Sequence, residues 1–166
     1  MAILDILKFP DPRLRIKAQK IVEMTPELRH QIDDMYETMY ARKGVGLAAT
    51  QVNIHKQFFV MDVSITHDQC ICIINPVILH KEGVQYEGEG CLSVVETFDK
   101  VKRAQTVHLQ AMDIDGKTFE LQAEGLMAAC IQHEMDHLNG ILFIDHLSRL
   151  KQERIKTKID KILRRE

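Results

Sequence analysis

The run His-Glu-Met-Asp-His occupies positions 133–137 of this 166-residue chain. Residues four positions apart lie on the same face of an α-helix, so a helix here would allow His133 and His137 to bind one metal ion. Glu134 could then exchange a proton with water at that ion. The alternative is a surface helix with two unrelated histidines, which the rest of the sequence makes less favourable.

Hydrophobic periodicity predicts a helix around this run and two further helices. The central helix is expected from about residue 124 to residue 137. An earlier helix is expected to begin at Thr25, an N-cap residue, and to stop near Gly44. A third helix is expected over about residues 146–163.

β-Branched and apolar residues predict strands between these helices. The expected strands cover residues 57–63, 70–74 and 77–86, and a hairpin joins residues 106–113 to residues 117–123. No repeat, linker or low-complexity segment interrupts the pattern. We therefore expect one α+β domain over residues 1–166, with antiparallel sheets around a central metal-binding helix that carries the His-Glu-x-x-His run, plus a C-terminal helix.

The composition is typical of a globular protein with a core, since apolar residues make up 45% and charged residues 28% of the chain. No apolar run approaches the ~20 residues that span a bilayer, and the first residues do not resemble a secretory signal. We therefore expect a cytoplasmic protein without a membrane partner. The four cysteines are expected to stay reduced, although an oxidising compartment would allow two disulfides.

The net charge of −2 is unevenly distributed. Residues 147–166 hold eight basic and three acidic side chains, so this segment carries +5 and the remainder carries −7. An apolar stripe in the segment leaves a basic face on the opposite side. The segment is interpreted either as a solvated helix packed on the core or as a helix that binds a polyanion.

Two histidines rarely complete a metal site, so a third protein ligand is needed. Downstream candidates are Asp145, His146 and Glu153. Upstream, residues 89–93 have the sequence Glu-Gly-Cys-Leu-Ser, in which Cys91 could supply a thiolate to zinc or iron(II). A loop cysteine on its own is more often a small buried apolar residue, so both interpretations stay open at this point.

A third segment, residues 44–51, has the sequence Gly-Val-Gly-Leu-Ala-Ala-Thr-Gln, which suits a tight turn that exposes backbone groups. Together, residues 44–51, 89–93 and 132–137 resemble the three signature motifs of peptide deformylase, in that family's order and spacing. The resemblance extends to Asp-Pro-Arg-Leu-Arg at 11–15 and Gly-Ile-Leu-Phe at 140–143. It covers essentially the whole chain and is closest to the type I bacterial branch, which has a C-terminal helix.

This resemblance implies a hydrolase that removes the formyl group from the N-terminal formylmethionine of newly made proteins and releases formate. It implies one divalent metal ion, natively Fe2+ with Zn2+, Ni2+ or Co2+ as substitutes, held by Cys91, His133 and His137. Glu134 would act as general base on water. The side-chain amide of Gln51 and the backbone N–H of Leu92 would donate hydrogen bonds to the carbonyl oxygen as negative charge develops there.

The resemblance also implies that N-formylmethionyl peptides bind as an extended strand beside the backbone of Gly44 to Gly46 and of Gly90. The methionine side chain would enter a pocket lined by Val45, Leu126, Ala129 and Cys130. The last three share a helix face with His133, and the plainer interpretation of each is core packing. Bacterial members use the C-terminal helix at the ribosome, so ribosomal RNA, and not DNA, is the polyanion expected for residues 147–166.

One segment departs from the family pattern. After Ser93, bacterial members commonly have an apolar residue, proline, glutamate and, a few residues later, arginine. This chain has Val95 in place of the proline and Phe98 where the arginine often lies. Because residues 94–100 border the substrate groove, we expect an active enzyme with an altered substrate or inhibitor preference.

Two other functions are compatible with the run at 133–137. A metallopeptidase would cleave unformylated peptides internally, but no downstream third ligand is evident. A structural zinc domain, or a former enzyme now used for binding, would close its site with four protein ligands and would not need Glu134 or Gln51. Formate release from a formyl-methionyl peptide discriminates between these functions.

Overall fold

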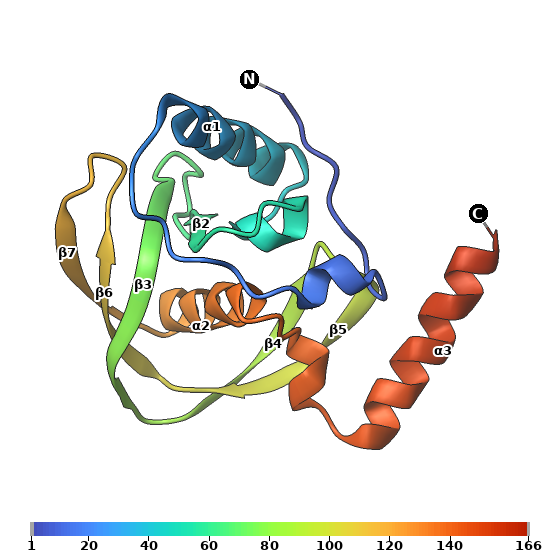
Figure 1. The fold of residues 1–166 in the computed structure, drawn as a ribbon. Helices are drawn as coiled ribbons and strands as arrows, with labels where there is room; N and C mark the ends of the chain where they lie inside the picture. Colours follow the sequence, from blue (N-terminus) through green and yellow to red (C-terminus); the bar gives the residue numbers. More distant parts are fainter. Residues whose placement is uncertain (1, 166) are drawn as a thin grey trace.

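The computed structural model describes residues 2–165 (Figure 1). Its strands form two antiparallel sheets. The larger sheet has the order β1-β2-β3-β6-β7, with the bounds Gly46–Ala48, Phe58–Met61, Ile71–Glu82, Thr106–Met112 and Thr118–Glu124. The smaller sheet pairs β4 (Gln85–Cys91) with β5 (Val94–Arg103). The α-helices are α1 (Pro26–Ala41), α2 (Leu126–Leu138) and α3 (Arg149–Arg165).

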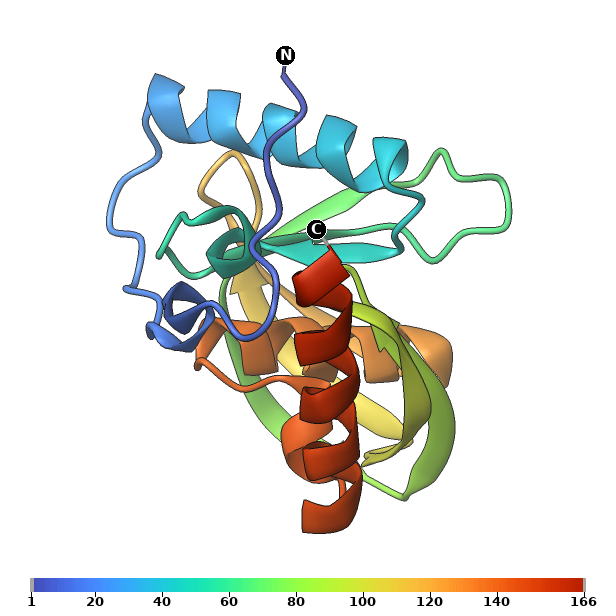
Figure 2. The ribbon, with the colours of Figure 1, turned by 90° about the vertical axis from the view of Figure 1, so that its right-hand side faces the viewer.

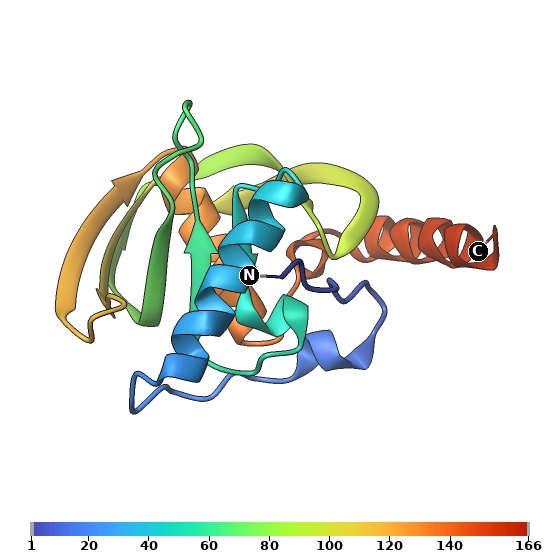
Figure 3. The same ribbon diagram turned by 90° about the horizontal axis from the view of Figure 1, so that it is seen from above.

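Helix α2 lies between the two sheets (Figures 1 and 3). Strand β2 shows how the larger sheet is covered, because Phe59 packs in the cluster that contains Ile131 of α2, whereas Phe58 packs with Met35 of α1. Successive side chains of a strand point to opposite faces, and both phenylalanines are fully buried. The run at residues 133–137 therefore lies on an interior helix and not on a surface helix.

The predicted helices are confirmed, with shifted ends. Thr25 caps α1 as predicted, since its hydroxyl accepts a backbone hydrogen bond from the first turn at 3.1 Å. The central helix begins at Leu126, shortly after the predicted start at about residue 124, because β7 continues to that residue and Gly125 then has a φ of 62°. Glycine adopts this conformation without strain and so separates strand from helix. The start of α3 is also later than predicted, because residues 143–146 form a separate 3-10 helix.

The strand predictions are less accurate. The hairpin of residues 106–113 and 117–123 is confirmed as β6 and β7. The strand character expected at 70–74 and 77–86 is largely confirmed, but the boundary between the two is wrong, since one strand, β3, continues through Pro76 and ends at Glu82. Its pairing with β6 shifts register between Ile74 and Val77, so the missing N–H of the proline falls at an irregularity.

Strand β1 and the β4–β5 hairpin are absent from the sequence prediction. Glycine is unfavourable inside strands, and Gly46, Gly88 and Gly90 lie in these elements. Tertiary packing stabilises the hairpin instead, because Val94 and Val101 of β5 are buried in a cluster with residues 142–144. All four cysteines are free thiols.

Helix α3 lies on the side of the molecule opposite β7 (Figures 1 and 3). Ile155 and Ile159 attach it to the cluster that contains Val94 and Val101. Within the described residues, no other element covers its outer face (Figure 2). The predicted apolar stripe is therefore confirmed as a packing face at Ile155 and Ile159, whereas Leu150 of the stripe is 56% exposed, and the basic side chains remain exposed.

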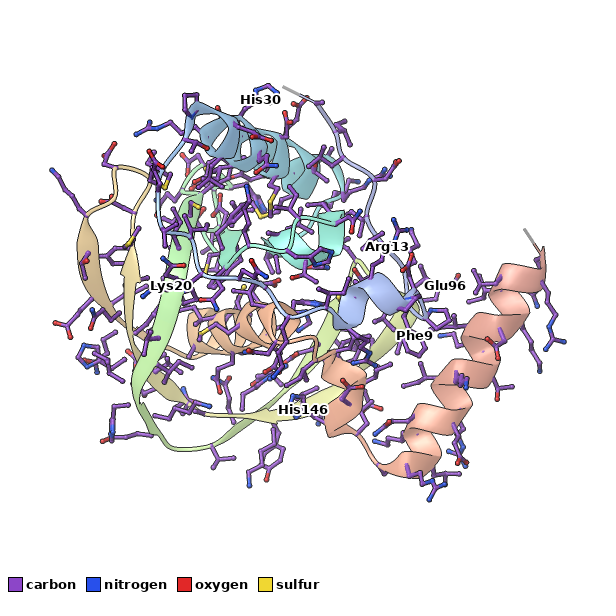
Figure 4. The ribbon with its side chains drawn as sticks, in the orientation of Figure 1. Phe9, Arg13, Lys20, His30, Glu96 and His146 are labelled. Atoms are coloured by element: carbon purple, nitrogen blue, oxygen red, sulfur yellow. The ribbon has the colours of Figure 1, made fainter. Side chains whose placement is uncertain are left out.

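Two lysines of α3 also contact the outer end of the β4–β5 hairpin. Lys151 Nζ lies 3.2 Å from Asp99 Oδ1, and Lys158 hydrogen-bonds the carbonyl oxygen of Glu96, which Figure 4 shows beside α3.

Within residues 2–165, no helix combines the length and the apolar character needed to cross a bilayer.

Candidate active site

The run at residues 133–137 forms part of α2, as predicted. His133 and His137 lie about one turn apart, and their Nε2 atoms are separated by 3.3 Å. His133 is 8% exposed and His137 is fully buried. The two Nε2 atoms therefore face one position inside the protein, called the ligand point below.

Cys91, the last residue of β4, brings a thiol to the same point. Its Sγ lies 3.3 Å from His137 Nε2, and the three candidate ligand atoms lie within 4.8 Å of one another. A tetrahedral ion with bonds of ~2.0–2.3 Å separates its ligand atoms by roughly 3.3–3.7 Å, so this arrangement fits a divalent metal. Burial lowers the pKa of His137, which keeps this imidazole in the neutral form that binds metals.

The downstream candidates do not reach this point. Asp145 pairs with Arg15 at 2.5 Å. His146, on the connection between α2 and α3, lies 2.8 Å from Asp136 (Figure 4). Glu153 lies on the surface of α3. Among these candidate third residues, Cys91 is the one whose ligand atom lies beside those of His133 and His137.

A second layer of charged residues holds His133. Glu89 Oε1 lies 2.8 Å from His133 Nδ1, and Arg103 contacts the same carboxylate at 2.8 and 2.9 Å. Burial opposes ionisation of Glu89, but hydrogen bonds from Arg103 and His133 outweigh it and lower the pKa of Glu89 to about 2. A carboxylate on Nδ1 fixes the imidazole so that Nε2 points to the ligand position.

Glu89 and Arg103 have no role in the site predicted from the sequence. A signal for Glu89 was available, because it belongs to the 89–93 motif and metal-binding histidines usually need a carboxylate partner. Arg103 has no local signal, since its contact with Glu89 depends on the pairing of β4 with β5.

Glu134 lies beside the ligand point and is 3% exposed. Its Oε1 has no hydrogen-bond partner among the described residues. Burial raises the pKa of Glu134 to about 7, although the charge of His133 opposes the rise. A carboxyl group with a pKa in this range can both accept and donate a proton near neutral pH.

Gln51 is held with its amide directed into the site. The side-chain oxygen of Gln51 accepts a hydrogen bond from Ala48 N at 2.9 Å, which turns Nε2 toward Cys91 Sγ at 3.6 Å and Ser93 Oγ at 3.0 Å. Leu92 follows Cys91 in the turn between β4 and β5, and the neighbouring Ser93 N donates to Cys91 Sγ at 3.4 Å. Two donors therefore flank the thiol, from different parts of the chain.

A cavity of about 420 Å³ opens at this site. All of the site residues predicted from the sequence line it except His137, which is fully buried. Val45 and Leu126 are 43% and 60% exposed, so simple core packing does not describe them, whereas Ala129 and Cys130 are buried. Phe98 also lines the cavity, in agreement with the expectation that residues 94–100 border the substrate groove.

The cavity lies between two strands with available edges. Strand β1 ends the order of the larger sheet, and β4 pairs only with β5 within residues 2–165. Gly44 and Gly46 line the cavity on one side, and Gly88 and Gly90 line it on the other. An extended chain could therefore hydrogen-bond to backbone on either side.

The sequence model of the polypeptide deformylase family matches residues 3–153. The chain belongs to this family. Deformylation of the N-terminal formylmethionine of nascent chains is the family's reaction, and the chain is accordingly a metal-dependent hydrolase of formylated peptides.

Curated polypeptide deformylases are similar to the chain over nearly its whole length. It is 53% identical to the peptide deformylase of Chromobacterium violaceum over 161 residues. This match covers 97% of the chain and 96% of that protein. It is 52% identical to the peptide deformylase of Acinetobacter baumannii strain SDF over 166 residues. This match covers 99% of the chain and 94% of that protein.

Solved deformylase structures share the fold. A peptide deformylase from Legionella pneumophila matches with a TM-score of 0.93 and 45% identity, over 98% of this chain and 96% of that one. The Ehrlichia chaffeensis enzyme, in complex with actinonin, matches with a TM-score of 0.93 and 38% identity, over 97% of this chain and 98% of that one.

Proposed function

We propose that Cys91, His133 and His137 bind the metal ion of this deformylase and that Glu134 is its general base. The observation that carries the proposal is the convergence of three ligand atoms within 4.8 Å of one another beside a buried carboxyl group. A divalent ion there supplies Lewis-acid polarisation of a carbonyl and a lowered pKa for water. We propose Fe2+ as the native ion, since a thiolate with two imidazoles accepts Fe2+, and Zn2+, Ni2+ or Co2+ as substitutes.

Glu134 would move a proton twice in each turnover. It takes the proton of the attacking water and then delivers it to the nitrogen that leaves as the formyl C–N bond breaks. Its pKa of about 7 suits both directions, because the group neither holds nor releases the proton too strongly. The products are formate and a peptide with a free amino group.

Gln51 and Leu92 would stabilise the negative charge on the carbonyl oxygen. The Gln51 amide is held in place by Ala48 N, so it can donate to the oxygen without first reorganising. The backbone N–H of Leu92 lies in the turn next to Cys91 and would provide the second donor. Loss of one such donor typically raises the barrier by ~2.7–4 kcal/mol.

We propose that the substrate binds as an added strand between β1 and β4. Its backbone would pair with Gly44 to Gly46 on one side and with Gly90 on the other. The methionine side chain would enter the apolar part of the cavity, which is lined by Val45, Leu126, Ala129 and Cys130. Main-chain pairing tolerates varied residues after methionine, which suits an enzyme that acts on many nascent chains.

Residues 1–166 would form one catalytic domain located in the cytoplasm, where α3 binds ribosomal RNA. The +5 charge of residues 147–166 and the uncovered outer face of α3 support this docking. Binding should weaken steeply as salt rises. Ribosome co-sedimentation at two salt concentrations tests it, with Lys156→Glu expected to reduce binding and Glu120→Gln, on β7, expected to leave it unchanged.

Formate release from formyl-Met-Ala-Ser by oxygen-free, metal-loaded protein tests the catalytic proposal. Glu134→Gln should keep its metal and lose roughly 10²–10⁴-fold in rate, whereas Glu120→Gln should retain full activity. Full activity in Glu134→Gln would exclude Glu134 as the base. Metal analysis of the same protein tests for iron, and activity lost in air would agree with an oxidisable thiolate. Internal cleavage of an unformylated peptide would indicate a peptidase instead.

A further inference from the structure

Phe98 is an exposed aromatic residue at the mouth of the active site. Its side chain is 75% exposed, yet it lines the same cavity as Glu134 and Cys91. It adds little to the core, and the register of the hairpin places it opposite Gly90. An exposed ring at the rim of a binding cavity is positioned to contact what the cavity binds.

The ring lies across the two glycines of β4. A Cβ atom at Gly88 would lie 2.4 Å from Phe98 Cε1, and one at Gly90 would lie 3.3 Å from Phe98 Cδ2. The ring therefore covers the backbone of β4 and extends from β5 toward the other edge of β4. Within residues 2–165, that edge carries no paired strand.

The two faces of the β4–β5 hairpin have different surroundings. Glu89 points to the face that contacts α2, because its carboxylate reaches His133. Side chains alternate along a strand, so Gly88 and Gly90 belong to the opposite face. Phe98 belongs to that outward face too, since it is paired with Gly90.

A substrate strand beside β4 must alternate in the same way. The methionine side chain enters the pocket formed by α2, so it points to the inward face. The side chain of the next residue then points to the outward face, where the Phe98 ring lies. We propose that Phe98 is a specificity-determining residue that contacts the residue after formylmethionine and favours an aromatic or large apolar side chain there. This inference rests on the proposed binding of the substrate along β4.

The test compares kcat/KM for formyl-Met-Phe-Ser and formyl-Met-Gly-Ser with the metal-loaded, full-length enzyme. The wild type should prefer the phenylalanine peptide by about 3- to 10-fold, as expected for one aromatic contact. In Phe98→Ala the ratio of the two kcat/KM values should fall to about one, and in Phe98→Trp it should persist. Gly88→Ala, whose new methyl group displaces the ring, should also lower the ratio.

Tyr86→Ala is the matched control. Tyr86 is an aromatic residue on the same face of β4, is 61% exposed and lies outside the cavity lining, so its removal should leave the ratio unchanged. A wild-type ratio near one, or an unchanged ratio in Phe98→Ala and Gly88→Ala, would overturn the role of Phe98 while leaving the catalytic proposal intact. Failure of the wild type to release formate from either peptide would instead overturn the catalytic proposal, and this inference with it.

Discussion

A Cβ atom at Gly46 would lie 2.5 Å from Glu134 Oε2. The edge strand β1 thus lies so close to helix α2 that a side chain at position 46 would clash with Glu134. The close approach places the backbone of β1, which can pair with an extended chain, next to the carboxyl group of Glu134. This carboxyl group is the one proposed to move protons.

Gly46→Ala should lower kcat/KM for formyl-Met-Ala-Ser by at least ~10-fold, because the methyl group must displace either the Glu134 carboxylate or strand β1. Circular dichroism should remain that of the wild type. Gly44→Ala is the comparison, since its new Cβ would meet the flexible end of Leu92 at 2.9 Å and the side chain can move aside. Equal losses in the two variants would contradict a specific clash with Glu134.

Glu89→Gln should weaken metal binding by roughly 10- to 100-fold, because the carboxylate that orients His133 loses its charge. Arg103 also loses its ion pair with Glu89, although it keeps the one with Asp136 at 2.7 Å. Competition with a chromogenic chelator measures the affinity directly. Glu87→Gln, on the same strand but exposed, should bind metal as the wild type does, and an equal loss there would indicate a general effect of charge.

Gln51→Ala should lower kcat for formylated peptides by roughly 10²–10³-fold, since one hydrogen-bond donor to the developing oxyanion is lost. KM should change little, because the interaction forms mainly in the transition state. Steady-state kinetics with formyl-Met-Ala-Ser separate the two parameters. A raised KM with an unchanged kcat would assign Gln51 to ground-state binding instead.

Asp62 predicts a pH-dependent contribution to stability away from the active site. Burial opposes its ionisation, but hydrogen bonds from Ser64, Tyr40 and Gln69 lower its pKa from 3.8 to about 2. The contribution of ionised Asp62 to the stability of the folded protein is therefore complete above about pH 4, and it is lost as the pH falls toward 2. Asp62→Asn should lower the free energy of unfolding by about 1–3 kcal/mol at pH 7.

Urea unfolding of the wild type and of Asp62→Asn at pH 7, 4 and 2.5 measures this effect. The difference between the two proteins should shrink between pH 4 and pH 2.5, because the Asp62 carboxyl group of the unfolded chain becomes protonated there, whereas that of the folded protein, with its pKa of about 2, is still mostly ionised. Asp68→Asn, in the neighbouring exposed loop, serves as control. A difference that stays constant over the whole range would contradict the assignment.

The sequence predicted the three α-helices and the β6–β7 hairpin because their signals are local. Thr25 at the start of α1 and the turn between β6 and β7 depend on a few neighbouring residues. The ligand candidates His133 and His137 are also local, since helical spacing brings them together. Cys91 was found through its resemblance to a family motif, and the structure brings its sulfur to the same point.

The missed features depend on contacts between distant segments. Gly88 and Gly90 argue against a strand locally, and β4 forms because the hairpin packs on α2 and on residues 142–144. Arg103 reaches Glu89 only through this pairing. The position of the Phe98 ring likewise depends on glycines across the hairpin, so residue identity alone could not place it.

The packing of Phe98 on Gly88 also constrains how the enzyme can diversify. Because a Cβ atom at Gly88 would lie 2.4 Å from the ring, any side chain at position 88 must displace the Phe98 ring from β4. A lineage that first exchanges Phe98 for a small residue can later accept a side chain at position 88. In the reverse order, the first substitution displaces the ring, so the effects of the two substitutions on the groove should not be additive.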